Sequence, residues 1–103
     1  MKKMLMATTA AALLATHAYA DAHAKEVKLG VEFGFTGPIE SLTGPMSAGA
    51  ELAMKEVTDS GMLLDGAKVT SIRADSGCID NGLAVSGAER LIAEGVSGII
   101  GGD

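Results

Sequence analysis

Three strand-like segments alternate with two helix-length segments along this chain, and this order constrains the fold more than any other feature. Residues 27–33 alternate apolar and polar side chains, residues 68–74 are rich in β-branched residues, and residues 96–101 are short and almost continuously apolar. These patterns are typical of strands, and the last of them predicts a strand covered on both faces. Helix-length connections favour parallel pairing through right-handed crossovers. The sequence therefore predicts an α/β fold with a parallel half-sheet in the order β-α-β-α-β.

Both helix-length segments carry apolar residues at helical spacing. The first helix is predicted to begin near Pro45, a residue tolerated at the first helical position, and to end at Gly61. Asp80 is a suitable N-cap for the second, which runs to about Glu94. We expect the apolar stripes to face the sheet. They are Met46, Ala50, Ala53 and Val57 on the first helix, and Val85, Ala88, Leu91 and Ile92 on the second.

The first twenty residues have the features of a secretory signal peptide. Two lysines near the start precede an apolar run, and residues 18–20 match the small-x-small pattern of a cleavage site. The alternative is a short transmembrane anchor, but the run is shorter than the roughly 20 apolar residues that cross a bilayer. We therefore expect cleavage near Ala20 and an exported mature chain, residues 21–103.

The composition narrows the classes of function. The chain has 8 basic and 13 acidic residues, with a formal net charge of −5. Nucleic acids and anionic membrane surfaces attract clustered Lys and Arg, so neither is expected as the main partner. The two histidines, His17 and His23, lie in or beside the leader. The ordered part that follows them therefore has no imidazole for acid–base catalysis or metal binding, and we expect no enzyme activity, no cofactor and no metal site.

Ligands of open parallel sheets bind beyond the carboxyl ends of the strands. In this chain the loop at residues 34–44, the loop at residues 75–79 and the segment after Gly101 form that edge. The sequence stops at Asp103, where the third loop begins, and an open half-sheet leaves a strand edge unpaired. We therefore expect residues 21–103 to be the first part of a longer protein.

The first of these loops has the groups to hold a small polar ligand. Thr36 and Ser41 supply hydroxyl groups, Leu42 supplies apolar surface, and the following helix begins close by. The other interpretation is a plain turn whose hydroxyl groups cap that helix. Asp103 lies at the same edge, where it either binds an ammonium group or is a solvated terminal residue.

The glycines after the first strand raise the alternative of a Rossmann-like, nucleotide-dependent enzyme. Gly30, Gly34 and Gly37 have the spacing G-x-x-x-G-x-x-G, whereas a dinucleotide site has G-x-G-x-x-G. A pyrophosphate site also needs a tight turn directly into the helix, and this loop is longer. The spacing therefore disfavours a nucleotide site.

Cys78 is the single cysteine of the sequence. In an exported protein an odd thiol indicates a disulfide partner outside the given sequence, on another molecule or in a further segment. A buried, unpaired cysteine is a second interpretation, and a catalytic nucleophile a weak third, because no histidine is near to activate it. Asp75 and Asp80 flank this cysteine, but two carboxylates alone make a poor calcium site.

Three stretches of this sequence, in their order, resemble the opening of type I periplasmic solute-binding proteins. They are KLGVEFGFTGP at residues 28–38, GAELAMKEV at residues 49–57 and GLAVSGAERLIAEGVSGIIGG at residues 82–102. This family serves ABC importers of branched-chain amino acids, other amino acids, amides and urea. The resemblance implies two α/β lobes with the ligand closed between them. It places residues 21–103 in the N-terminal part of the first lobe.

The resemblance also implies the function. The expected protein is a periplasmic monomer that binds an amino acid, amide or urea and delivers it to an ABC permease. A ligand-sensing domain on the same fold is the alternative. In amino-acid-binding members a cysteine after the second strand bridges to one just after the third, so Cys78 would pair beyond Asp103. Thr36, Ser41 and Leu42 carry over as candidate wall residues of the ligand site.

Overall fold

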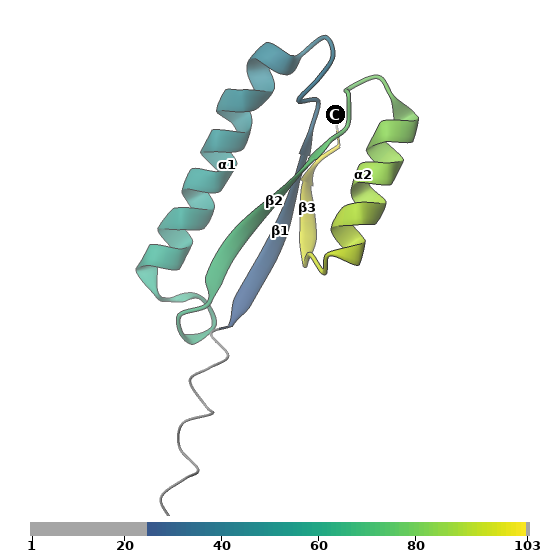
Figure 1. Ribbon diagram of the computed structural model, residues 1–103. Coiled ribbons are helices and arrows are strands. Elements are labelled where there is room, and N and C mark those ends of the chain that lie inside the picture. The colour runs from purple at the N-terminus through teal and green to yellow at the C-terminus, as the bar shows by residue number, and fades with distance from the viewer. Residues whose placement is uncertain (1–24, 103) are drawn as a thin grey trace, which may run out of the picture.

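The computed structural model describes residues 25–102, so the predicted signal peptide at residues 1–20 and the site residue Asp103 lie outside the described residues. The elements follow the predicted order β-α-β-α-β (Figure 1). Their bounds are β1 (Glu26–Phe33), α1 (Glu40–Ser60), the short 3-10 helix η1 (Leu63–Asp65), β2 (Lys68–Asp75), α2 (Asn81–Ala93) and β3 (Gly98–Gly101).

The three strands form one parallel sheet in the order β2-β1-β3. β1 pairs along its whole length with β2, from Glu26 opposite Lys68 to Phe33 opposite Asp75. The shorter β3 pairs with the second half of β1, over residues 29–32. β1 is central, so the crossover from β1 to β2 and the crossover from β2 to β3 run in opposite directions along the sheet. Since both crossovers are right-handed, α1 and α2 lie on opposite faces of the sheet (Figure 1).

The core beneath α1 depends on the alternation in β1. Val31 and Phe33 point to this face and are buried together with Met54 of α1. Partly buried apolar residues surround them: Leu29, Phe35, Ala50 and Val69. Alternating side chains on a strand point to opposite faces, so the pattern that predicted the strand also predicted the side that is buried.

The opposite face of the sheet is covered by Leu91 of α2, which is completely buried, as predicted. It lies over Gly30 of β1, where an added Cβ would come within 2.7 Å of the Leu91 Cδ1 atom. The lack of a side chain at Gly30 therefore lets α2 approach the sheet. Ala88 is half-buried, but Val85 and Ile92 are exposed, contrary to the expectation that they face the sheet.

α1 begins at Glu40, before the predicted start at Pro45, and the proline lies in its second turn. Proline lacks the N–H that an interior helical residue donates, so it usually marks the first turn. Two buried hydroxyl groups near it donate to carbonyls of the same helix. Thr43 donates to the Glu40 carbonyl (3.1 Å) and Ser47 to the Gly44 carbonyl (2.9 Å). These bonds satisfy the hydroxyl groups without water.

The buried face of α1 is also different from the predicted stripe. Its buried residues are Thr43, Ser47 and Met54. Met46 and Val57 are 47% and 41% exposed. Because the two hydroxyl side chains are satisfied within the helix, they can replace apolar groups in the interior. The side of α1 that faces the sheet therefore includes these hydroxyl residues as well as three members of the predicted stripe, Ala50, Ala53 and Val57.

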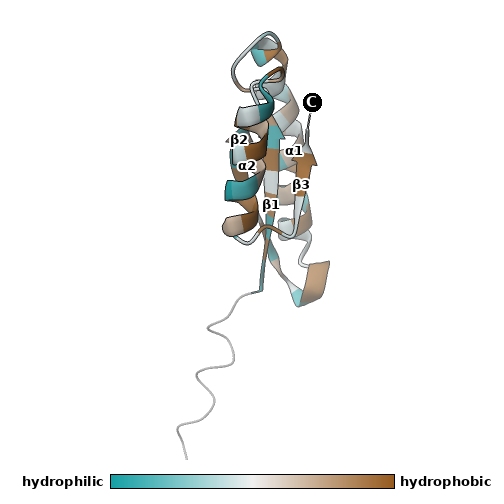
Figure 2. Ribbon diagram, turned by 90° about the vertical axis from the view of Figure 1, so that its right-hand side faces the viewer, coloured by the Kyte–Doolittle hydropathy of each residue, from teal (hydrophilic) through white to brown (hydrophobic). Residues whose placement is uncertain are grey.

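β3 is apolar but exposed along its whole length, and the prediction that both its faces are covered is wrong for the described residues. Figure 2 shows hydrophobic residues on this strand near the C-terminal end. The two helices pack mainly on β2 and β1. An apolar pattern shows that a strand is suited to burial, but it does not identify the element that covers it.

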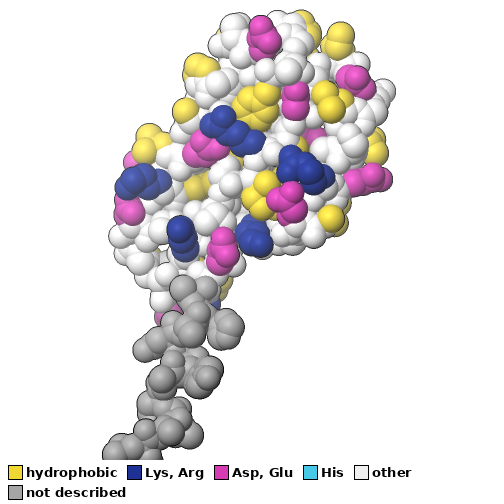
Figure 3. Space-filling view, viewed as in Figure 1, with side chains coloured by type: hydrophobic (Ala, Val, Ile, Leu, Met, Phe, Trp, Pro, Cys, Tyr) yellow, Lys and Arg dark blue, Asp and Glu magenta, His cyan; other side chains and the backbone are white. Residues whose placement is uncertain are grey.

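Charged side chains of both signs are interspersed on the face seen in Figure 3. Arg90 of α2 pairs with Glu94, the residue that follows this helix (2.9 Å), and Lys55 pairs with Asp59 within α1. Such exposed pairs are screened by water and contribute little to stability. Neither α1 nor α2 has the combination of length and apolar character that a membrane-spanning helix requires.

Candidate functional site

The carboxyl ends of all three strands meet at one edge of the sheet, as the parallel order predicted (Figure 1). The segment at residues 34–39 follows β1, residues 76–80 follow β2, and Gly102 follows β3. In open parallel sheets the ligand crevice lies where the connections diverge to opposite faces. The strand order here is β2-β1-β3, and in doubly wound sheets of this order the switch point lies between β1 and β3, where the crevice is expected.

Asp75, the last residue of β2, joins the first two loops. Its Oδ2 atom accepts a hydrogen bond from the Thr36 hydroxyl (2.6 Å), and Oδ1 accepts from the Thr36 backbone N–H (3.1 Å). Oδ1 also accepts from the backbone N–H of Gly77 (2.9 Å) in the second loop. One carboxylate therefore holds both loops. Because the Thr36 hydroxyl donates its proton to Asp75, this hydroxyl offers a ligand its lone pairs only.

These contacts lower the pKa of Asp75 below its ordinary value. The main cause is the hydrogen bond from the Thr36 hydroxyl. Partial burial opposes this effect, and the backbone N–H groups of Gly77, Thr36 and Phe35 reinforce it. Hydrogen bonds of this kind favour the charged form of a carboxyl group. The carboxylate is therefore the form that holds the loops.

Asp75 is predicted to make stability depend on pH in acid. Its folded-state pKa lies below the unfolded value of about 3.9, so its contribution is complete above that value and is lost as the pH falls through the folded-state pKa. We expect Asp75→Asn to lower the melting temperature at neutral pH and the difference from wild type to shrink below about pH 4. Thermal melts over a pH series measure this, and a difference that persists unchanged in strong acid would contradict it.

A second contact fixes the start of the first loop. The guanidinium of Arg73, on β2, lies 5.2 Å from the centre of the Phe35 ring. The guanidinium donates two hydrogen bonds of 2.7 Å to the Glu51 carboxylate of α1. Hydrogen bonding to Arg73 is the main reason that the pKa of Glu51 is lowered. The Phe35 ring also lies 6.2 Å from that of Phe33. Both anchors of this loop, Arg73 and Asp75, therefore come from β2.

Glycines allow the first two loops to approach each other closely. A Cβ at Gly34 would lie 2.9 Å from the Cβ of Cys78. A Cβ at Gly37, which has a φ of +100°, would lie 2.6 Å from the carbonyl oxygen of Gly77. Both separations are shorter than real Cβ contacts, so a side chain at either position would push the loops apart.

A glycine also allows the end of β3 to lie close against the end of β1. Gly101 has a φ of +124°, and a Cβ there would overlap the carbonyl oxygen of Glu32. The same oxygen accepts a hydrogen bond from the backbone N–H of Gly102 (3.2 Å). The chain that leaves β3 is therefore held against Glu32, close to the end of β1.

The structure separates the residues that were predicted to line the site. Thr36 lies in the first loop and is exposed. Ser41 and Leu42, expected in a loop, lie in the first turn of α1, and Leu42 is 59% exposed. The sequence pattern alone does not identify Asp75 as the residue that holds the first loop. The only signal for it was a carboxylate at the end of a predicted strand, followed by a small residue and a glycine.

Cys78 lies in the second loop and is half-buried, with its thiol free among the described residues. It has a φ of +64°, and its backbone N–H donates to the Ser76 hydroxyl (3.3 Å). Asp80 caps α2 as predicted, because its carboxylate accepts a hydrogen bond from the Leu83 N–H (3.0 Å). Within residues 25–102 no three His, Cys, Asp or Glu side chains are grouped so that they could hold a metal ion.

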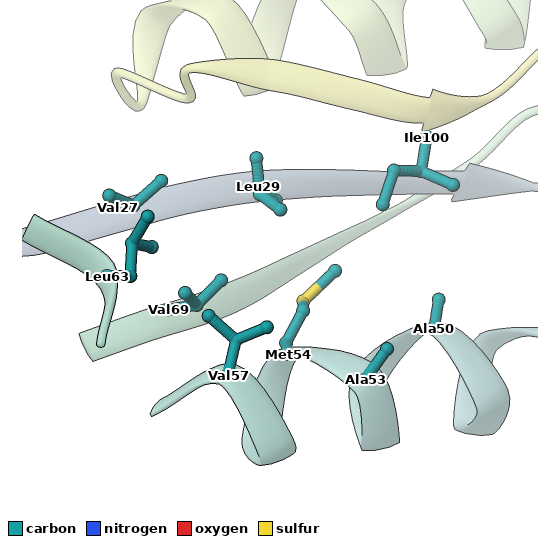
Figure 4. A pocket seen from close by; sticks show the side chains of 9 residues that line it. All are labelled: Val27, Leu29, Ala50, Ala53, Met54, Val57, Leu63, Val69 and Ile100. Carbon is teal, nitrogen blue, oxygen red and sulfur yellow. The ribbon is translucent and has the colours of Figure 1, made fainter. Parts of the chain in front are cut away.

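An apolar groove of about 300 Å³ lies between α1 and the sheet (Figure 4). Val27, Leu29 and Val69 of the strands face the helix across it, and Ile100 of β3 lies at its far side (Figure 4). Its lining also includes Ala50, Ala53, Met54, Val57 and Leu63. A polar ligand needs a few well-placed polar groups, and the lining side chains supply none. The groove is therefore unsuited to a small polar ligand.

Known proteins are similar to this sequence over nearly its whole length. The periplasmic binding protein family matches residues 26–103. The Leu/Ile/Val-binding protein homolog 7 of Brucella suis biovar 1 (strain 1330) is 38% identical over 102 residues, which cover 98% of this chain and 24% of that protein. The protein of the same name from Brucella melitensis biotype 1 has the same identity and coverage. That of Brucella abortus (strain 2308) is 37% identical over the same shares.

The chain thus spans about a quarter of the length of these curated relatives. The family match covers every described strand and helix. The parallel three-stranded sheet with a helix on each face is consistent with the start of a lobe of such a protein. The chain therefore belongs to the type I periplasmic binding proteins, in the family that includes the Leu/Ile/Val-binding proteins.

Proposed function

We propose that this protein is the periplasmic substrate-binding component of an ABC importer, and that it captures a small polar solute of the amino-acid class. Residues 21–103 form the N-terminal part of its first lobe. The observation that carries the proposal is the edge at which three parallel strands end together, with the first two loops joined by Asp75. The names of the relatives favour a branched-chain amino acid over amides or urea.

The mechanism is closure of two lobes around the ligand. Contacts made by both lobes stabilise the closed form, and the permease then recognises that form. No covalent bond is made or broken. The first lobe contributes the Thr36 loop and the chain that follows β3, and Asp103 is proposed to act there on the ligand's ammonium group. Cys78 is proposed to form a disulfide with a cysteine after β3.

Calorimetry on the protein produced from its own gene tests the binding role. We expect saturable binding of leucine, isoleucine or valine in the micromolar range or tighter, with weaker binding of acetamide and urea. The proposal would be contradicted if the protein bound none of the twenty common amino acids. Uptake of the labelled amino acid by cells with and without the gene tests delivery to a permease.

Residues 21–103 alone are expected to bind no amino acid tightly. One lobe supplies only part of the contacts of a two-lobed site, and the binding free energy depends on both parts. Calorimetric titration of this segment with leucine should give no measurable heat at micromolar concentrations. Micromolar binding by the segment would show that the described edge is a complete site.

A further inference from the structure

The first loop at the ligand edge is held in place largely by side chains. Thr36 lies after β1 ends, and its backbone N–H and hydroxyl both donate to Asp75. Asp75 itself lies in the sheet, paired with Phe33. One carboxylate therefore fixes the position of the loop relative to the end of a strand in the sheet. Loss of that carboxylate would leave Thr36 without either of these bonds.

The carboxylate also fixes the second loop through the N–H of Gly77. The two loops are already in contact, because Gly37 and Gly77 are too close for a side chain between them. A movement of Thr36 away from Asp75 would therefore change the relative position of both loops. A binding site tolerates little such movement, since contacts must be held within about 0.5 Å of the productive geometry.

We propose that Asp75 is a positioning residue for ligand binding, which acts through Thr36 to set the first loop at the edge shared by β1 and β3. This inference rests on the proposed function, because it assigns a residue to that same site. Asp75 need not touch the ligand. Its carboxylate accepts hydrogen bonds from both loops, so the ligand meets loops whose positions are already fixed.

A double-mutant cycle on ligand affinity tests the proposal, with L-leucine as the probe and the protein produced from its own gene. Asp75→Asn removes the charge, and Thr36→Val removes the hydroxyl group that donates to it. We expect each change to weaken leucine binding about tenfold, the effect of one hydrogen bond to a charged group. The double variant should bind about as weakly as Asp75→Asn alone, because the hydrogen bond that Thr36→Val removes is one of those that the Asp75 carboxylate makes.

Two further variants separate positioning from general stability. Thr36→Ser keeps the hydroxyl group and should restore most of the affinity that Thr36→Val loses. Asp65→Asn is the matched control, because the Asp65 side chain is 99% exposed and follows α1 at the opposite end of the sheet. It should bind leucine as wild type does. Thermal melts of every variant establish that the proteins compared are folded.

Three results would overturn the proposal: unchanged affinity in Asp75→Asn, additive effects of the two substitutions, or no recovery in Thr36→Ser. If Asp75→Asn does not fold, the two Thr36 variants decide. If the wild type binds no amino acid, the proposed function fails. The amide NMR signals of Thr36 and Gly77 in the ligand-free protein then decide whether Asp75 holds the loops. These signals shift in Asp75→Asn if it does and stay unchanged if it does not.

Discussion

We expect Leu91→Ala to lower the free energy of unfolding by about 2–5 kcal/mol. Leu91 is completely buried, and both of its terminal methyl groups lie within 3.4 Å of the position that a Cβ of Gly30 would occupy. Gly30 has no side chain that could move into the space left behind, so truncation leaves a cavity between α2 and β1. Denaturant titration of the wild type and the variant measures the loss.

The neighbouring residue provides a matched control. Ile92 also loses a branched apolar side chain on substitution by alanine, but it is 67% exposed. Because little of this side chain is removed from water, we expect Ile92→Ala to change the free energy of unfolding by about 0.5 kcal/mol or less. Equal losses in the two variants would show that α2 does not pack on the sheet through Leu91.

Gly101→Ala is expected to separate the end of β3 from β1. The new Cβ would overlap the carbonyl oxygen of Glu32, and the φ of +124° is one that L side chains rarely adopt. Relief requires the backbone of β3 to move, which also breaks the hydrogen bond from Gly102 to Glu32. We expect a loss of at least about 1–3 kcal/mol in the free energy of unfolding, and faster hydrogen exchange in β3.

Gly98→Ala is the control for this change, since Gly98 begins the same strand. A Cβ there would have its nearest neighbour, the Leu29 Cδ2 atom, at 4.0 Å, which is ordinary contact distance. We expect its free energy of unfolding to remain within about 0.5 kcal/mol of wild type. If Gly98→Ala were as destabilising as Gly101→Ala, the effect would come from general intolerance of side chains in β3 and not from the contact with Glu32.

The strands and the edge they form could be predicted because the signals are local. Alternation along residues 27–33 identifies both a strand and its buried face, and helix-length connections require parallel neighbours. Once the strands are parallel, their carboxyl ends must lie together. The Asp80 cap could likewise be predicted from a single residue before a helical pattern.

The burial of two hydroxyl residues on α1 could not be predicted from hydrophobicity. Thr43 and Ser47 are polar in composition, yet both are buried because their hydroxyl groups bond to carbonyls one turn earlier. Met46 and Val57 are apolar, yet both are substantially exposed. Local hydrogen bonding and the position of the neighbouring elements decide which residues are buried, and neither is visible in a count of apolar side chains.

The arrangement of the candidate site required the structure for a similar reason. Thr36 and Asp75 are 39 positions apart, and their contact depends on the register that places Phe33 opposite Asp75. The sequence indicates that both residues lie at the same edge, but not that the Asp75 carboxylate accepts hydrogen bonds from both loops. Pro45 predicts a later start of the helix, which leaves Ser41 in the loop, but Ser41 lies within α1.

The central position of β1 has a consequence for how the chain folds. The first strand to be synthesised has no neighbour nearby in the sequence, since Glu26 pairs with Lys68 and Leu29 with Gly98. Both pairings close long stretches of chain before any sheet contact is gained, which slows folding and leaves early segments accessible to other molecules. No strand of the described sheet can therefore pair before β2 has been synthesised, and β1 gains its second partner only with β3.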